Sequence, residues 1–380
     1  MSDVFSSFLG SPAAIRKFRP HEAVVIYGAG NMGRKVLRVL SKQGMIPIGF
    51  IDEYSKSRSM DGIPVYSLSD PLLPRNATVI VAVFNRDKNA GFAGIESNLQ
   101  AAHFSSIMSF EQFYLSCPNE FESSFYWLAN PDYLTDRMNE VRAADALWAD
   151  ERSRQIYRSQ IGFRITGNHE LLPKPNADSQ YKPDDVPLVH EPYRFVDIGA
   201  FDGDTLESLK KQNVVLDSIL AFEPDMRNFQ ALVKRVSTFG PYASQTILMP
   251  CGVGRRCGTV VFSEDGAESS KIVEGSPVPS VHGSRIPVVS LDEMLVGYRP
   301  NYIKFDVEGA EEDALYGMRK TIETDRPMLA VSVYHRPADI FGLPLLLSSW
   351  NYPADYYLRM HGEHTFDTVF YAIPRLTITK

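Results

Sequence analysis

The sequence predicts an α/β protein: a mainly parallel sheet that ends in an antiparallel hairpin in the C-terminal half, preceded by a separate Rossmann-like α/β domain. Two observations predict this class. A buried-type strand runs into a glycine-rich turn and then a helical stretch at residues 23–43, and the same order recurs at 195–211. Further strands alternate with helical stretches after each turn, and short strand–helix–strand connections favour parallel pairing.

Composition places the chain among globular proteins and argues against two kinds of partner. The 380 residues are 44% hydrophobic and 22% charged, a length that suits about two or three domains. The formal net charge of −7 argues against nucleic-acid binding, which usually needs a concentrated basic face. No apolar run approaches the roughly 20 residues that span a bilayer, and the three cysteines lack zinc-site or disulfide spacing. We therefore expect a cytoplasmic protein with no membrane span and no nucleic-acid partner.

The first predicted domain covers residues 1–118 and carries a glycine motif. Its expected elements are strands 23–27, 46–51 and 79–83 and a helix over 34–43. The first strand leads into Gly28, Gly30 and Gly33, which have the spacing of a dinucleotide-binding turn. Asp52 comes 19 residues after the last of these, where such folds place an acid on the ribose. The motif is a candidate second nucleotide site, for NAD or a nucleotide sugar.

Residues 119–192 are predicted to connect the two domains. Their first part, 124–164, is rich in Ala, Arg, Glu, Leu and Tyr, which is helical composition. Five prolines then fall between residues 173 and 192 and exclude regular helix there. This second part is either a mobile linker or an ordered loop over a site. We favour the loop because Gln180 and Tyr181 lie within it.

Residues 193–380 are predicted to form the second α/β domain. Its expected strands are 195–198, 218–222, 246–249, 258–263, 286–290, 302–305, 328–333, 356–360 and 368–373. Its expected helices are 205–211, 228–236 and 310–320. The last two strands flank Gly362, Glu363 and His364, which is hairpin spacing. A parallel sheet that ends in an antiparallel hairpin is the strand order of class I methyltransferases.

The strongest motif joins strand 195–198 to the helix after it. The strand contains Asp197, and Gly199 and Gly203 follow in a Gly-x-x-x-Gly turn. Glycines let a ligand approach the backbone closely, and a helix N-terminus offers unpaired N–H groups. S-adenosylmethionine needs both features, because its carboxylate binds N–H donors and its α-ammonium binds an acid such as Asp197. The alternative is an ordinary strand-to-helix turn of an α/β fold.

An acid at ribose spacing supports the cofactor interpretation. Glu223 directly follows the next strand, 20 residues after Gly203, and an acid at this place in a nucleotide-binding sheet accepts both ribose hydroxyls. The alternative for Glu223 is a solvated loop acid. The residues expected to bind S-adenosylmethionine are Asp197, Gly199, Ala200, Asp202, Gly203, Thr205, Glu223 and Pro224.

Two further residues, Asp306 and His335, are candidates for catalysis. Asp306 falls at the carboxyl end of strand 302–305, where open α/β sheets bind their ligands. Its carboxylate suits a neighbour of the sulfonium, a base for an acceptor hydroxyl or a ligand of a divalent metal, and the sequence leaves these roles open. His335 follows strand 328–333 toward the same edge. An unperturbed pKa of about 6.5 suits a general base, although a histidine can equally cap a strand end.

The motifs VDIGAFDGDT, FEPD, VSLDEML, IKFDVEGAEEDAL and VSVYHR resemble the FkbM-type methyltransferase family in order and spacing, over roughly the last 250 residues. The resemblance implies a class I fold, S-adenosylmethionine as cofactor, and usually O-methylation of sugars, polysaccharides or polyketide-type products. By position it implies that Asp197, Gly199 and Gly203 hold the methionine part, Glu223 the ribose, and Asp306 the methyl-transfer centre. One departure is Met360-His361, where the family pattern has a histidine–aromatic pair.

The leading hypothesis is therefore an S-adenosylmethionine-dependent O-methyltransferase acting on a sugar, a polysaccharide precursor or a related small-molecule or glycan acceptor. An alternative is an NAD(P)-dependent sugar-nucleotide oxidoreductase or epimerase driven by the first domain, although we find no dehydrogenase catalytic set near its glycine motif. A non-catalytic sugar-nucleotide-binding protein is the third hypothesis. Whether a divalent metal takes part is left open.

Overall fold

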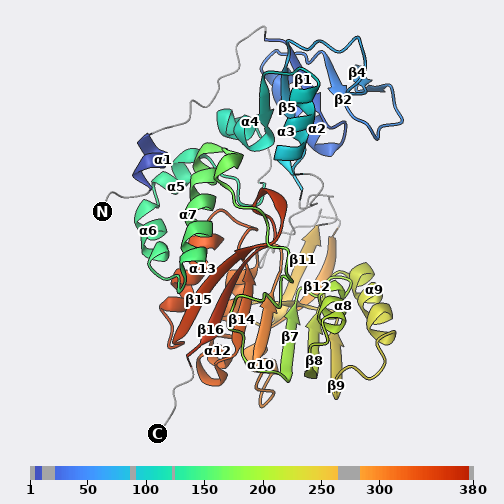
Figure 1. Ribbon diagram of the computed structural model, residues 1–380. Helices are drawn as coiled ribbons and strands as arrows, with labels where there is room; N and C mark the ends of the chain where they lie inside the picture. Colours follow the sequence, from blue (N-terminus) through green and yellow to red (C-terminus); the bar gives the residue numbers. More distant parts are fainter. Residues whose placement is uncertain (1–4, 11–21, 86–90, 122–124, 264–282, 376–380) are drawn as a thin grey trace. The chain divides into compact units, whose positions relative to one another are not determined.

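The chain divides into two compact units in a computed structural model that describes residues 5–10, 22–85, 91–121, 125–263 and 283–375. Unit 1 comprises Met1–Asp145, Arg154–Asn176 and Met360–Asp367. Unit 2 comprises Ala146–Ser153, Ala177–Arg359 and Thr368–Lys380. Each unit collects segments that lie far apart in the sequence (Figure 1). None of the helices in the described ranges combines the length and apolar composition that crossing a membrane requires.

Unit 1 contains a sheet of mainly parallel strands. Within its described residues these strands are β1 (Val24–Tyr27), β2 (Gly49–Ile51), β3 (Ser59–Met60), β4 (Ile63–Tyr66), β5 (Thr78–Val81) and β6 (Ile107–Ser109). They lie in the order β3-β4-β2-β1-β5-β6, and β3 is antiparallel to β4 while the other neighbours pair in parallel. Strand β2 is shorter than the predicted 46–51, because Ile46 and Ile48 are exposed rather than in the core and Pro47 between them has no N–H to donate.

Helices complete unit 1. The α-helices among its described residues are α1 (Ser6–Gly10), α2 (Asn31–Lys42), α3 (Phe92–Ala101), α4 (Phe110–Ser116), α5 (Pro131–Thr135), α6 (Met138–Asp145) and most of α7 (Glu151–Thr166). The predicted helical segment 124–164 thus contains α5, α6 and most of α7, and α2 begins three residues before the predicted 34. Ser109 begins α4 with a capping box, because its hydroxyl accepts from the Gln112 N–H while the Gln112 side chain accepts from the Ser109 N–H.

Unit 2 is built on a sheet with the predicted strand order. Within its described residues the strands are β7 (Tyr193–Ile198), β8 (Leu216–Phe222), β9 (Gln245–Met249), β13 (Tyr302–Phe305), β14 (Met328–Ser332), β15 (Ala354–Met360) and β16 (Thr368–Pro374). They lie in the order β15-β16-β14-β13-β7-β8-β9, from left to right in Figure 1. Strand β16 is antiparallel to β14, whereas β14, β13, β7, β8 and β9 pair in parallel. The predicted α/β class with a mainly parallel sheet is confirmed.

Helices and a small second sheet complete unit 2. The helices are α8 (Asp204–Lys211), α9 (Met226–Ser237), α10 (Leu291–Met294), α11 (Glu311–Tyr316), α12 (Arg319–Asp325) and α13 (Asp339–Ser348). The small sheet, in the order β10-β12-β11, consists of β10 (Gly252–Val253), β11 (Gly258–Ser263) and β12 (Gly283–Val289).

The predicted single helix 310–320 is interrupted at Gly317. The Gly317 carbonyl accepts from the Asp292 N–H at 2.9 Å and from the Ser290 hydroxyl at 3.0 Å. A Cβ at Gly317 would lie 2.1 Å from the Gly254 carbonyl oxygen, so the backbones approach too closely for any other residue. Tertiary contacts therefore separate α11 from α12.

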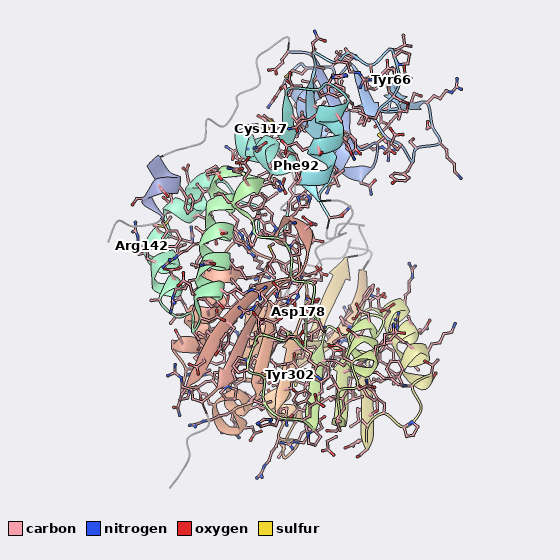
Figure 2. The ribbon with its side chains drawn as sticks, viewed as in Figure 1. Tyr66, Phe92, Cys117, Arg142, Asp178 and Tyr302 are labelled. Carbon is pink, nitrogen blue, oxygen red and sulfur yellow. The ribbon has the colours of Figure 1, made fainter. Side chains whose placement is uncertain are left out.

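The proline-rich segment packs as an ordered loop against the unit 2 sheet. The Tyr302 hydroxyl donates to the Tyr181 carbonyl at 2.6 Å, and the Tyr371 hydroxyl donates to the Gln180 carbonyl at 2.5 Å. Tyr181 and Val186 are buried in the same apolar cluster as residues of β7, β13 and β14. Figure 2 labels Asp178, near the start of this loop, and Tyr302 on β13. These contacts favour the loop interpretation over a mobile linker for residues 177–192.

Candidate active site

The residues singled out in the C-terminal half converge at the carboxyl edge of the unit 2 sheet. Gly199 directly follows β7, Glu223 follows β8, Asp306 follows β13, and His335 lies three residues beyond β14. Because these four strands are parallel neighbours in the order β14-β13-β7-β8, their carboxyl ends meet at one edge. The structure thus brings the expected cofactor residues next to the expected catalytic ones.

The turn after β7 requires glycine at its first position. Gly199 has φ +80°, and a Cβ there would lie 1.8 Å from the Asp306 carbonyl oxygen. The N–H groups of Gly199 and Ala200 both donate to the Phe222 carbonyl, at 3.0 and 2.9 Å. Gly203, at φ +87°, is the N-cap of α8. The glycine therefore lets the β7 turn lie directly against the end of β13, where Asp306 stands.

Gly199→Ala should lower the free energy of unfolding by about 2–4 kcal/mol, because it adds left-handed strain to an overlap with the backbone of Asp306. Gly240→Ala is the matched control: Gly240 has φ +67°, but no atom lies within 4 Å of a Cβ built there. Urea denaturation of both variants measures the difference. Equal stability of the two variants would contradict the close approach described above.

Glu223 connects the turn after β7 with the segment that leads into α9. Its Oε2 accepts from the Phe201 N–H and its Oε1 from the Asp225 N–H, both at 2.8 Å. The side chain is 6% exposed, and burial raises its pKa despite these hydrogen bonds. A carboxylate oxygen can accept more than one hydrogen bond, so each retains acceptor capacity for a ligand hydroxyl. Asp225 in turn caps α9 by accepting from the N–H groups of Arg227 and Asn228.

Asp197 is fully buried and has a partner that the sequence analysis missed. Lys304 lies beside it in register on β13, and its Nζ donates to Asp197 Oδ1 at 2.8 Å and to the Gly199 carbonyl at 2.5 Å. Among the described residues, Asp197 Oδ2 has no hydrogen-bond partner. Burial raises the pKa of Asp197 to about 6, against the opposing charge of Lys304. In the sequence, the one sign of this ion pair is Lys304 itself, a lysine inside the otherwise apolar strand 302–305.

The other expected cofactor residues take different places. Asp202 forms an ion pair with Arg235, which also binds Glu207 Oε2 at 2.7 Å, so this carboxylate faces α9. Thr205 is buried in the first turn of α8, and Ala200 is fully buried in the turn. The last of them, Pro224, is half-buried beside Glu223.

Asp306 and His335 are brought together as the sequence predicts. His335 Nε2 lies 3.5 Å from Asp306 Oδ1 and 3.6 Å from Glu308 Oε2. His335 Nδ1 lies 2.7 Å from Glu311 Oε1, a partner that the sequence analysis did not identify. On the other side, the Tyr181 hydroxyl donates to Asp306 Oδ2 at 3.2 Å. The ordered loop therefore reaches the candidate catalytic residues.

The environment of His335 corrects one expectation. Burial lowers the pKa of a histidine, but the charges of Glu311, Asp306 and Glu308, together with the hydrogen bond to Glu311, outweigh it and raise the pKa to about 10. The unperturbed value of about 6.5 therefore does not apply in this site. In this environment the His335 ring is the charged imidazolium at neutral pH.

The glycine motif of unit 1 is built like the turn after β7. Gly28 has φ +104°, and a Cβ at Gly33 would lie 2.1 Å from the Gly28 carbonyl oxygen. Gly30 is the N-cap of α2. Asp52 Oδ2 accepts from the Ala29 N–H, and its Oδ1 accepts from the N–H groups of Tyr54 and Ser55, all at 2.8 Å. In unit 1 the acid after β2 thus accepts a hydrogen bond from the turn after β1. In unit 2 Glu223, after β8, does the same for the turn after β7.

Unit 1 also contains a buried histidine cluster that the sequence analysis did not find. Glu111 Oε1 lies 2.5 Å from His364 Nδ1, and its Oε2 lies 3.1 Å from His169 Nε2. Burial would raise the pKa of Glu111, but the two histidines lower it well below its usual range. His361 and His364, which lie at the predicted hairpin, are both buried, and both belong to unit 1.

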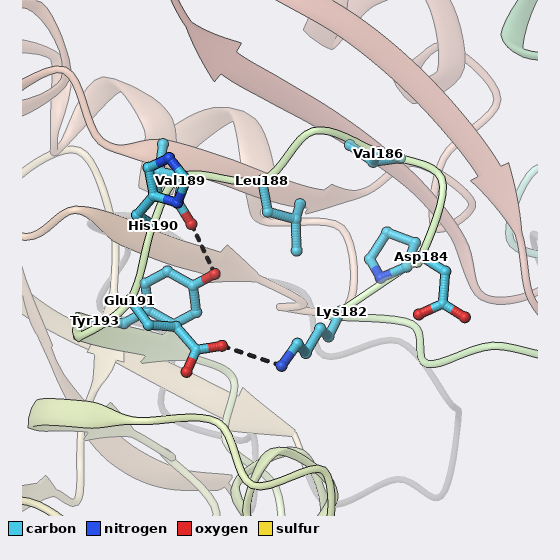
Figure 3. A pocket seen from close by; sticks show the side chains of 9 residues that line it. Lys182, Asp184, Val186, Leu188, Val189, His190, Glu191 and Tyr193 are labelled. Atoms are coloured by element: carbon cyan, nitrogen blue, oxygen red, sulfur yellow. Dashed lines mark hydrogen bonds and ion pairs between the residues drawn. The ribbon is translucent and has the colours of Figure 1, made fainter.

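A hollow of about 540 Å³ lies in the proline-rich loop (Figure 3). Lys182 Nζ binds Glu191 Oε1 at 3.0 Å across it, and the Tyr193 hydroxyl donates to the Val189 carbonyl at 2.9 Å. Because Tyr193 begins β7, the hollow lies at the end of that strand opposite Gly199. None of the residues singled out from the sequence lines it.

Comparisons with known proteins agree with this geometry. Residues 197–363 match the family model described as the methyltransferase FkbM domain. A crystal structure of a methyltransferase FkbM from Methylobacillus flagellatus KT has a TM-score of 0.73 at 21% identity, over 97% of this chain and 99% of that one. An rRNA methylase from Streptococcus thermophilus has a TM-score of only 0.30 at 14% identity, over 48% of this chain and 86% of that one. No curated protein gives a significant match.

The family match includes Asp197, Glu223, Asp306 and His335, and the structural likeness covers 97% of the chain. By this match the chain is a methyltransferase, and its residues 197–363 are similar to the methyltransferase FkbM domain.

Proposed function

We propose that this methyltransferase transfers the methyl group of S-adenosylmethionine to a hydroxyl of a sugar, a polysaccharide precursor or a related small-molecule or glycan acceptor. S-adenosylmethionine as the methyl donor follows from the FkbM domain. The transfer to a hydroxyl is supported by the carboxyl edge of the unit 2 sheet. There Glu223, the turn at Gly199 and the pair of Asp306 and His335 follow neighbouring parallel strands.

The cofactor residues fit S-adenosylmethionine. Asp197 Oδ2 is a buried anionic oxygen without a partner among the described residues, which suits the α-ammonium group. Glu223 keeps acceptor capacity on both oxygens for the two ribose hydroxyls. The first turn of α8, opened by Gly203, offers N–H groups for the carboxylate. We therefore place the cofactor against the turn after β7.

The acceptor side lies on the next strands, β13 and β14. Bound S-adenosylmethionine supplies an electrophilic methyl group, and the residues of the chain must position a hydroxyl for in-line displacement and receive or relay its proton. Asp306 stands between the Tyr181 hydroxyl and the ring of His335, so two neighbours hold its carboxylate in place. A site lined by carboxylates and a tyrosine hydroxyl suits a polar acceptor with several hydroxyl groups.

A screen of nucleotide sugars and glycans with radiolabelled S-adenosylmethionine tests the acceptor class. We expect label to enter a hydroxylated carbohydrate as an alkali-stable methyl ether. Label found only on an amine, a nitrogen heterocycle or a protein carboxylate would contradict the proposal while leaving the methyltransferase assignment intact.

A second proposal concerns the glycine motif of unit 1. Its acid, Asp52, holds the turn with the same kind of backbone contact as Glu223, and this likeness supports binding of a nucleotide such as NAD or a nucleotide sugar. We expect Asp52→Asn to weaken such binding by at least about tenfold, because a charged acceptor is lost. Calorimetry on the full chain with NAD and with a uridine-diphosphate sugar measures the change, and Asp61→Asn, an exposed acid of the same unit, is the control. Equal affinities in the two variants, or no binding by wild type, would contradict this proposal.

A further inference from the structure

Three carboxylates surround the ring of His335. Asp306 and Glu308 approach Nε2, and Glu311 approaches Nδ1. One oxygen each of Asp306 and Glu311 and a ring nitrogen of His335 all lie within 4.8 Å of one another, the spacing of atoms that can share one metal ion. Three carboxylates around one ring leave an excess of negative charge even when the ring is protonated.

Glu311 fixes the orientation of the ring. Its Oε1 is 2.7 Å from His335 Nδ1 and also accepts from the Val307 N–H at 2.9 Å. The side chains of both Glu311 and His335 are almost fully buried, so the ring cannot turn freely. A metal-binding histidine characteristically directs its other ring nitrogen to a carboxylate in this way. Glu311 Oε2, moreover, is buried and has no hydrogen-bond partner in the described part of the chain.

The distances at Nε2 suit a shared ion better than a hydrogen bond. The separations of 3.5 and 3.6 Å exceed the usual 2.7–3.2 Å of an N–H···O hydrogen bond. Ligand atoms at about 2.1 Å from a tetrahedral ion lie about 3.4 Å apart. The separation of Nε2 from each of these two oxygens is therefore close to that of two ligand atoms on a common ion.

The backbone at Glu308 is strained in a way that serves this arrangement. Glu308 has φ +52° and Gly309 has φ +96°. A left-handed conformation is unfavourable for a glutamate, and such strain persists where surrounding structure enforces it, often at functional sites. The conformation places the Glu308 carboxylate 3.6 Å from His335, although 55% of that side chain remains exposed to an incoming acceptor.

We propose that Asp306, Glu308 and Nε2 of His335 bind a divalent cation, which displaces the proton that Nε2 carries in its absence, with Glu311 as the residue that positions the ring. A site of one imidazole and two carboxylates suits Mn²⁺ or Zn²⁺. The proposal rests on the proposed function: the cation binds the acceptor oxygen and makes its O–H more acidic. The proton leaves to water, the oxygen forms its bond to the methyl carbon, and the carbon–sulfur bond breaks to give a methyl ether and S-adenosylhomocysteine.

The test uses the full chain, stripped with chelator and dialysed, and titrated with MnCl₂ while electron paramagnetic resonance measures free Mn²⁺. We expect one tight site per chain in wild type, and affinity at least tenfold weaker in His335→Gln and Glu308→Gln. Glu308 is half-exposed, so its variant should fold even where the buried histidine variant does not. The control is Glu312→Gln, an exposed acid on α11 next to Glu311, which should bind Mn²⁺ as wild type does.

Equal Mn²⁺ affinity in wild type and Glu308→Gln, or no stoichiometric site in wild type, would overturn the proposal. Full methyl transfer by protein shown to be metal-free would also overturn it and leave Asp306 as the proton acceptor. Binding of S-adenosylhomocysteine is measured in parallel. If folded wild type does not bind S-adenosylhomocysteine, this result would count against the proposed function and not against the cation site.

Discussion

Glu223→Ala should weaken the binding of S-adenosylhomocysteine by about 10²–10⁴-fold. Two hydrogen bonds to a charged acceptor contribute about 1.5–3 kcal/mol each, and 1.4 kcal/mol is one decade in affinity. The structure adds a second reason, because the same carboxylate holds the N–H groups of Phe201 and Asp225. Alanine would remove the ribose acceptor and also free the two backbone segments that border the cofactor.

Calorimetry with S-adenosylhomocysteine measures this loss. Asp217→Ala is the control, since Asp217 is an acid on β8 that is exposed and lies at the end of the strand opposite Glu223. Thermal unfolding of both variants establishes that they fold. Unchanged affinity in a folded Glu223→Ala variant would mean that this acid does not border the cofactor.

Asp306→Asn should lower turnover by about 10²–10⁴-fold, the usual contribution of a group that assists proton transfer. The substitution keeps the shape of the side chain and removes its charge. Whether Asp306 receives the proton itself or holds a cation that promotes its loss, a neutral amide serves both roles poorly. Affinity for S-adenosylhomocysteine should stay within about tenfold of wild type, because the cofactor contacts are assigned to the ends of β7 and β8.

Single-turnover assays separate the chemical step from cofactor binding in this variant. His335→Gln should follow the same pattern, since its ring faces Asp306. Tyr181→Phe is a graded control that removes only the hydroxyl donor to Asp306 Oδ2, and its effect should be smaller. Wild-type turnover in both Asp306→Asn and His335→Gln would place the reaction centre elsewhere.

Local patterns in the sequence predict where the strands that precede the candidate site residues end. Strand 302–305 is a short apolar run ended by an acid, and β13 has these bounds. Strand 195–198 is extended at its start by Tyr193 and Arg194, but its carboxyl end is the predicted one. The candidate site residues follow the carboxyl ends of strands. A wrong prediction of where a strand begins therefore does not change the predicted position of these residues.

Contacts between distant segments account for what local patterns miss. Lys304 looks like an ordinary strand residue until the register with β7 places it beside Asp197. Glu311 begins a helix, and only the fold brings it to His335. The break at Gly317 depends on the backbone of Gly254, far from any local helix signal.

The histidine cluster of unit 1 is the largest omission, for the same reason. Glu111 and His364 are 253 positions apart, and no spacing rule connects them. The compact units likewise collect segments such as Met360–Asp367 with the N-terminal sheet, whereas the predicted domains 1–118, 119–192 and 193–380 were drawn as continuous stretches. Those boundaries stay predictions.

We infer that the carboxyl edge of the unit 2 sheet binds the methyl donor. Calorimetric titration of the full-length protein with S-adenosylhomocysteine, in wild type and in Asp52→Asn, tests it most directly. We predict saturable binding of one molecule per chain with the same affinity in both proteins, because Asp52 belongs to the glycine motif of unit 1. Absence of saturable binding by folded wild type, or binding that Asp52→Asn abolishes and Glu223→Ala leaves intact, would contradict the claim.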